Sequence, residues 1–172
     1  MRDNRSTCGE PSSANIRGHP IHPMIVQFPI TLLVGAFVSD LVYLITGNTF
    51  WPIFSYWLIL VGLLTGVAAG IAGATDFLTI GTPREHVAGW VHAGGNILVI
   101  ILTFINLMLR WENPVLTGTT LASGFILSLI VAATLVITGW YGGELSYRYM
   151  VGVVGPRGQT ISPQEEERRR QT

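Results

Sequence analysis

The feature that most constrains this chain is a set of four long apolar segments separated by short polar breaks. The segments cover roughly residues 24–46, 51–80, 86–111 and 119–146. Each is longer than the roughly 20 residues that an α-helix needs to cross about 30 Å of hydrocarbon. Membrane strands would instead show segments of about 10 residues with alternating polarity. We therefore expect an all-α integral membrane protein with four transmembrane helices.

The composition and the placement of charge agree with this expectation. Only 12% of the 172 residues are charged, against about 25% in soluble domains. Most of the charges lie before residue 18 or after residue 143. We expect a polar, disordered tail over residues 1–17, a transmembrane domain over 18–154 and a charged, disordered tail over 155–172. The zero net charge gives no reason to expect a nucleic-acid partner, and the lone Cys8 allows no internal disulfide.

The breaks between the apolar segments are short, so neighbouring helices should run antiparallel in an up-down-up-down bundle. In that topology Arg17, Arg84 and Arg148 lie at one end of the bundle and Arg110 lies at the other. The positive-inside rule then predicts a multi-pass protein of the cell membrane, meaning the plasma or inner membrane, with both termini in the cytoplasm.

The same topology gathers the polar side chains at that cytoplasmic end. The start of the first helix, the end of the second, the start of the third and the end of the fourth meet there. These stretches carry His19, His22, Asp76, His86, His92, Asn96 and Glu144. Polar residues within a membrane span are costly unless they face a partner or water, so this His/Asp/Glu cluster is the candidate site.

Four interpretations of the cluster stay open. Its groups can satisfy one another and fix the bundle, or relay protons and hold a quinone head group. They can bind haem b or another redox cofactor, with His22, Asp76, His92, Asn96 and Glu144 as the contact residues. They can also bind a transition-metal ion, with the four histidines His19, His22, His86 and His92 as ligands.

Asp40 lies deep in the first apolar segment, nearer the opposite end. Arg110, at the end of the third segment, shares that end in the predicted topology. We expect the two to form a structural ion pair, because a lone charge in the membrane interior is unfavourable.

Two functions from different classes compete. One is a membrane redox subunit that binds a cofactor at the histidine cluster. The other is a non-catalytic subunit or scaffold for partner membrane proteins or a second copy of the chain, favoured by the spacing of Gly62, Gly66, Gly70 and Gly73 on one helix face. Enzyme motifs such as HExxH, GxSxG and a phosphate-binding loop are absent from the sequence, so we do not expect a soluble-type enzyme.

The order of these residues resembles a family of bacterial membrane proteins catalogued as domain of unknown function 2231. The matching pieces, within about residues 18–153, are Gly18-His19-Pro20-Ile21-His22-Pro23-Met24-Ile25-Val26-Gln27-Phe28-Pro29-Ile30, the Asp40 region, Gly73-Ala74-Thr75-Asp76-Phe77-Leu78, Val91-His92-Ala93-Gly94-Gly95-Asn96 and Gly139-Trp140-Tyr141-Gly142-Gly143-Glu144-Leu145-Ser146-Tyr147. The resemblance implies a four-helix integral membrane domain and supplies no established activity. The family pattern commonly has histidines where this chain has Gln27 and, near the end, Tyr149. If either was an iron ligand in relatives, this chain would have to use His22, His86 or His92 instead.

Overall fold

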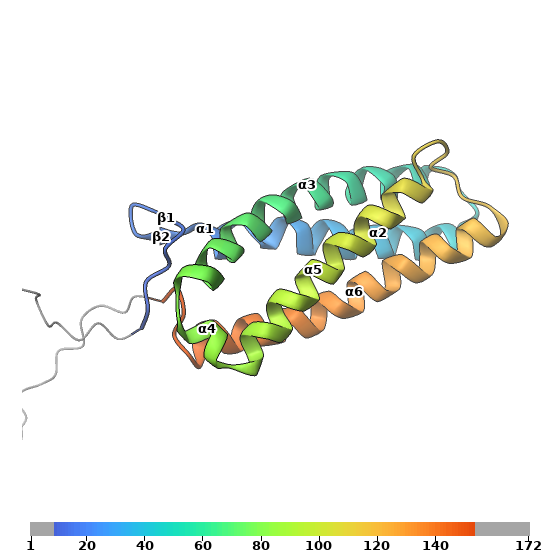
Figure 1. Ribbon diagram of the computed structural model, residues 1–172. Coiled ribbons are helices and arrows are strands. Elements are labelled where there is room, and N and C mark those ends of the chain that lie inside the picture. Colours follow the sequence, from blue (N-terminus) through green and yellow to red (C-terminus); the bar gives the residue numbers. More distant parts are fainter. Residues whose placement is uncertain (1–8, 154–172) are drawn as a thin grey trace, which may run out of the picture.

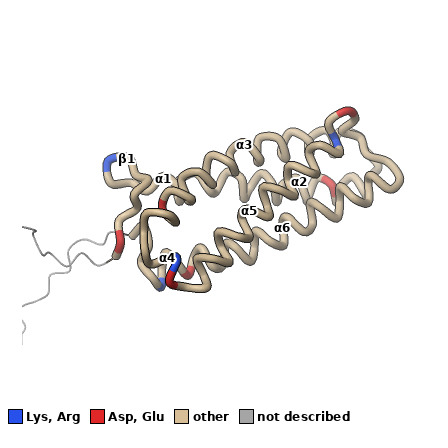
Figure 2. The backbone as a smooth tube through the Cα atoms, viewed as in Figure 1, with Lys and Arg blue, Asp and Glu red and all other residues tan. Residues whose placement is uncertain are grey.

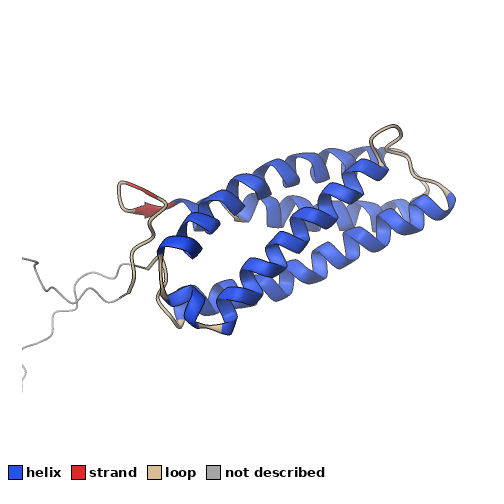
Figure 3. Ribbon diagram, viewed as in Figure 1, coloured by secondary structure: helices blue, strands red, loops and turns tan. Residues whose placement is uncertain are grey.

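The computed structural model describes residues 9–153, which fold as a bundle of four long helices. These helices are α2 (Gln27–Thr46), α3 (Phe50–Thr79), α5 (Val87–Leu109) and α6 (Gly118–Tyr147). Two short helices accompany them, α1 (Ile21–Ile25), which leads into α2, and α4 (Thr82–Glu85) between α3 and α5. A two-stranded ribbon of β1 (Asn15–Ile16) and β2 (His19–Pro20) precedes α1 (Figure 3).

The helix ends follow the local sequence. Gly47 takes a left-handed conformation with φ 66° after α2, and its N–H donates to the carbonyl of Tyr43. Glycine closes helices in this way because it has no Cβ to clash. Pro52 lies in the first turn of α3, where a missing N–H costs nothing. The boundary between α1 and α2 falls at Val26, one turn before Pro29, whose ring disfavours the preceding helical turn.

Successive long helices run antiparallel, as their contacts show. A Cβ placed at Gly62 of α3 would meet Leu33 of α2, and one placed at Gly66 would meet Pro29. The second hairpin is built in the same way, with Gly95 of α5 against Thr138 of α6. Small residues at these crossings let the backbones approach closely, which is how membrane helices gain packing energy.

The described part of the chain contains four helical stretches long and apolar enough to cross a membrane, α1 with α2 counted as one. Their outer surface carries many exposed large apolar side chains, including Ile45, Leu64, Ile71, Ile97 and Val136. The charged residues lie towards the two ends of the bundle (Figure 2). This arrangement is the one that a hydrocarbon layer around the middle of the bundle favours, so the chain is a multi-pass membrane protein.

The N-terminal stretch differs from the tail expected over residues 1–17. Residues 1–8 lie outside the described residues, as do residues 155–172 of the expected C-terminal tail. Residues 9–17, however, are folded against the bundle. Ser12 is buried, and Glu10 forms a backbone bridge with Val151 after α6. The two ends of the described chain therefore meet at one end of the bundle.

Candidate functional site

Two histidines from different halves of the chain meet inside the bundle. The ring of His22, from α1, lies against the ring of His92, from α5, with centroids 5.9 Å apart and planes at 88°. Both side chains are partly buried. We call these two rings the imidazole pair.

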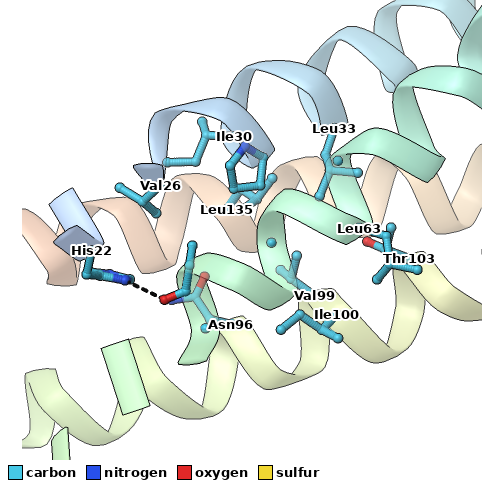
Figure 4. A pocket seen from close by; sticks show the side chains of 15 residues that line it. His22, Val26, Ile30, Leu33, Leu63, Asn96, Val99, Ile100, Thr103 and Leu135 are labelled. Carbon is cyan, nitrogen blue, oxygen red and sulfur yellow. Dashed lines mark hydrogen bonds between the residues drawn. The ribbon is translucent and has the colours of Figure 1, made fainter. Parts of the chain in front are cut away.

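Each ring is held by a hydrogen bond to the backbone of a neighbouring long helix. Nδ1 of His22 lies 2.8 Å from the carbonyl oxygen of Ala69 in α3 (dashed in Figure 4), and Nδ1 of His92 lies 2.8 Å from that of Thr138 in α6. A carbonyl oxygen can only accept, so each Nδ1 carries the proton and donates it. Within residues 9–153 no hydrogen bond engages either Nε2, which leaves the lone pair of each Nε2 available.

A glycine lies beneath each ring of the imidazole pair. A Cβ at Gly73 would come within 2.9 Å of the His22 ring, and a Cβ at Gly142 within 2.8 Å of the His92 ring. In both cases the glycine follows the carbonyl acceptor by one helical turn. The two helical hairpins therefore hold their histidines in the same way.

Asn96 follows His92 by one turn on the same face of α5. Its Nδ2 donates to the carbonyl oxygen of His92 at 2.7 Å. Asn96 also lines a cavity of about 50 Å³ that begins at His22 and runs between α2, α3 and α5 (Figure 4). Three of the five residues expected to contact a cofactor therefore lie close together: His22, His92 and Asn96.

Asp76 does not face the imidazole pair. Its carboxylate accepts hydrogen bonds from the Ser12 hydroxyl at 2.7 and 2.9 Å and from the backbone N–H groups of Ser13 and Ala14 at 2.8 and 2.9 Å. A carboxylate so fully engaged by donors is a structural anchor for the N-terminal segment. This contact has no local sign in the sequence, because the donors lie far from Asp76 along the chain.

Glu144 is also occupied elsewhere. It pairs at 2.9 Å with Arg148, which lies one turn later and caps the end of α6, and the Arg148 side chain is exposed. Such surface pairs contribute little to stability. The expectation of a single cluster of histidines and carboxylates is therefore wrong, because Asp76 and Glu144 contact other residues and not the imidazole pair.

The expected four-histidine metal site is corrected as well. The His86 ring stacks on Tyr149 with centroids 3.8 Å apart, and His19 is exposed in β2, paired with Ile16. Only His22 and His92 of the four come together. No group of three or more His, Cys, Asp or Glu residues in the described chain is placed to hold a metal ion.

The cavity beside the imidazole pair also bears on the haem interpretation. Pockets that hold cofactor-sized ligands usually measure about 300–1,000 Å³, and this cavity measures about 50 Å³. A porphyrin therefore does not fit it unless the helices move apart.

A second polar centre lies inside the bundle towards the opposite end. Arg110, which caps α5, donates from both terminal nitrogens to the two carboxylate oxygens of Asp40, at 2.9 and 2.7 Å. Both side chains are buried. The neighbouring hydrogen-bonding side chains come from α3, α5 and α6, and we call the whole set the ion-pair network: Asp40, Ser55, Asn106, Arg110 and Ser128.

The expected partners Asp40 and Arg110 are thus in contact, but the residues that support them were not expected from the sequence. The one available signal was Asn106, which precedes Arg110 by one helical turn and accepts from its Nε at 3.0 Å. Ser55 and Ser128 gave no signal, because serines in membrane helices usually bond to their own backbone.

The comparisons with known proteins agree with the architecture. The family described as "Predicted membrane protein (DUF2231)" matches residues 18–155, which is most of the chain. No curated protein and no solved structure matches it. The family description names no activity, cofactor or partner.

Proposed function

Because the chain belongs to this family of predicted membrane proteins of unknown function, we propose from its geometry that it is a non-catalytic membrane subunit that takes up and releases protons at the imidazole pair. The observation that carries the proposal is the fixed orientation of the two rings. Each Nδ1–H is bound to a helix carbonyl, which leaves Nε2 as the position where a proton can be added or removed.

Histidine suits this role because its charge changes within the physiological pH range. Two imidazolium rings 5.9 Å apart would repel each other, so the pair favours a state with one added proton over a state with two. The two rings would thus act as a single proton site shared between the halves of the bundle.

The proposal can be tested with ¹⁵N-labelled histidine in the protein reconstituted into lipid bilayers. The ¹⁵N NMR spectrum at pH 8 should show His22 and His92 protonated at Nδ1 alone, and acidification to pH 5 should add a proton at Nε2 of one ring. His22→Gln and His92→Gln assign the signals, and His19→Gln and His86→Gln are the matched controls. Rings that stay neutral across this range would refute the proposal.

A redox subunit that binds haem b remains the second candidate, for one specific reason. Histidines that ligate metals usually donate their other ring N–H to a carbonyl or carboxylate, and both rings of the pair do so. The small cavity counts against it. We expect a flat reduced-minus-oxidised optical spectrum for purified protein, whereas a haem signal that disappears in His92→Gln would establish this candidate instead.

The outer surface of α6 favours assembly of the chain with another membrane helix. Gly139 and Gly143 are one turn apart, and a Cβ at either would meet no atom within 4 Å. This spacing on a lipid-facing surface favours close packing against another helix, from a partner protein or a second copy. Native mass spectrometry of gently solubilised membranes should therefore show a complex that Gly139→Ile disrupts, and a clean monomer would contradict this part of the proposal.

A further inference from the structure

Thr103 of α5 carries a buried hydroxyl without a hydrogen-bond partner. Its side chain is 2% exposed, and its Oγ1 is the one buried side-chain polar atom of residues 9–153 that is left unpaired. Several other threonines of the long helices donate to a carbonyl about one turn earlier, as Thr75 does to Ile71 at 2.9 Å. Buried hydroxyls are rarely left unpaired, so the Thr103 hydroxyl points to a hydrogen-bonding molecule that binds beside it.

The space beside Thr103 is a cavity of about 50 Å³ inside the bundle (Figure 4). All but three of its 15 lining residues are apolar, and the exceptions are His22, Asn96 and Thr103 itself. Because apolar cavities of this kind stay dry and take up apolar molecules, the occupant has to be mostly apolar. A water-sized atom needs about 10–15 Å³ of such space, so the cavity has room for a molecule of about three to five non-hydrogen atoms.

Glycines of α3 keep this cavity open. Gly62, Gly66 and Gly70 all line it. Close packing requires the first of them, because a Cβ at Gly62 would come within 2.7 Å of a leucine of α2. A Cβ at Gly66 would lie 3.6 Å from Pro29, and one at Gly70 would lie 3.4 Å from its nearest neighbour, which are ordinary contacts. Close packing therefore does not explain the missing side chains at Gly66 and Gly70, which leave space for a separate molecule.

We propose that this cavity is a binding site for a small uncharged molecule with an apolar body of two to four carbon atoms and one oxygen, and that this oxygen pairs with the Thr103 hydroxyl. Short-chain alcohols represent this chemical class. No Asp, Glu, Arg or Lys lines the cavity, so the charge of an ionic ligand would be buried without a counterion. In the surrounding hydrocarbon the oxygen of such a molecule has no hydrogen-bond partner, so the bond to Thr103 favours the cavity over the lipid.

The inference goes beyond the proposed proton exchange and does not depend on it. Asn96 lies two helical turns before Thr103 on α5, which is about 10 Å along the helix axis. A molecule of this size that is bonded to Thr103 is too short to reach the imidazole pair as well. The ¹⁵N spectrum of the histidines therefore tests the proposed function, and the binding experiments below test this site.

The test is a titration of 1-propanol into the full-length protein in lipid nanodiscs, followed by methyl NMR. Ile100 lines the cavity, whereas its neighbour Ile101 is 50% exposed on the outer surface. We expect the Ile100 methyl signal to shift to saturation. The Ile101 signal should change only in proportion to the alcohol dissolved in the lipid. Proportional changes without saturation at both residues would overturn the site.

Thr103→Val tests the hydrogen bond, because it keeps the shape of the side chain and removes the hydroxyl. It should weaken 1-propanol binding about fivefold, which is the net effect of one neutral hydrogen bond. Xenon forms no hydrogen bond, so its binding to the same cavity should not change. Thr103→Ser keeps the hydroxyl and should bind 1-propanol within about twofold of the wild type. Equal 1-propanol binding in the wild type and Thr103→Val would contradict the proposal.

Gly66→Ala tests the cavity itself by filling part of it, and the ordinary contact with Pro29 lets the variant fold. We expect it to abolish saturable binding of 1-propanol and of xenon. Gly94→Ala is the matched control and should bind both, because its Cβ would meet no atom within 4 Å. Undiminished binding in Gly66→Ala would show that the alcohol binds elsewhere. Cyclohexanol, with about seven non-hydrogen atoms, exceeds the size limit, so saturation of Ile100 by cyclohexanol would also count against the proposed ligand class.

Discussion

Asp40 of α2 and Arg110 at the end of α5 form a two-pronged ion pair inside the bundle, with N···O distances of 2.9 and 2.7 Å. Ser128 donates a third hydrogen bond to the same carboxylate at 2.6 Å, and Ser55 accepts from the guanidinium at 3.2 Å. These contacts join all four long helices at one level. Burial of two charges is costly, and such a pair persists where further hydrogen bonds satisfy both partners, as they do here.

Removal of one partner should therefore destabilise the protein strongly. Asp40→Asn keeps the shape but leaves the Arg110 charge buried without its counterion, and we expect a loss of about 3–5 kcal/mol in the free energy of unfolding. Arg110→Met should cost a similar amount for the converse reason. Denaturant unfolding in detergent micelles, followed by tryptophan fluorescence, measures both.

The double variant Asp40→Leu/Arg110→Met is the control for that prediction. It removes both charges together, so its cost should be clearly smaller than the sum of the two single costs. Additive losses would mean that the two side chains act independently and that the pair does not couple α2 to α5.

Gly142 should be essential to the position of His92. A methyl group at Gly142 would come within 2.8 Å of the His92 ring, so Gly142→Ala must displace the ring and break its bond to Thr138. We expect a loss of about 1–3 kcal/mol, typical of an overfilled interior, together with a changed ¹⁵N signal for His92. Gly94→Ala on α5 is the control, because its Cβ would also meet no atom within 4 Å; equal effects of the two variants would mean that Gly142 does not determine the position of the His92 ring.

Asp76 should determine whether the N-terminal segment stays on the bundle. Hydrogen bonds to a charged group contribute about 1.5–3 kcal/mol each, and Asp76→Ala removes all those from Ser12, Ser13 and Ala14. We expect trypsin to cut after the exposed Arg17 about tenfold faster in this variant, because local opening controls proteolysis.

Glu85→Ala is the matched control for that cleavage, since Glu85 is an exposed carboxylate at the same end of the bundle. Ser12→Ala should give an intermediate rate, because the two backbone donors to Asp76 remain. An unchanged rate in Asp76→Ala would show that the strand pair of Asn15–Ile16 with His19–Pro20 holds the segment by itself.

The sequence was sufficient for the four helices because membrane spans depend on length and continuous apolarity, which are local properties. The expected second segment, 51–80, and the observed α3, Phe50–Thr79, differ by one residue at each end. The contact between His22 and His92 could also be expected from the sequence, since a four-helix topology brings the two segments that carry them to one end of the bundle.

The rest of the site depended on contacts between distant residues. Asp76 looked like a neighbour of the histidines, but the donors that occupy it come from residues expected to be a disordered tail. The sequence does not distinguish Thr103 from the other threonines, because its buried hydroxyl lacks a hydrogen-bond partner only in the folded bundle, where it lies beside a cavity. The repeated arrangement of Gly73 under His22 and Gly142 under His92 becomes visible only when the two hairpins are compared in space.

The orientation of the bundle in the membrane gives the last prediction. Three arginines lie at the end that carries the imidazole pair: Arg17 between β1 and β2, Arg84 in α4 and Arg148 just after α6. Arg110, at the other end, is buried in its ion pair. The positive-inside rule then predicts that the end with the imidazole pair, and both termini, face the cytoplasm. Expressed in a bacterial inner membrane, a C-terminal fusion to green fluorescent protein should fluoresce and a fusion to alkaline phosphatase should be inactive.

A fusion within the Asn113–Pro114 turn, between α5 and α6, should give the reverse pattern, because that turn lies at the opposite end of the bundle. Arg84→Glu together with Arg148→Glu should lower the preference for this orientation, whereas Arg110→Met should leave it unchanged, because the buried Arg110 charge is already neutralised by Asp40. An active phosphatase at the C-terminus of the wild-type chain would invert the topology, and protons would then enter the imidazole pair from the outer side of the membrane.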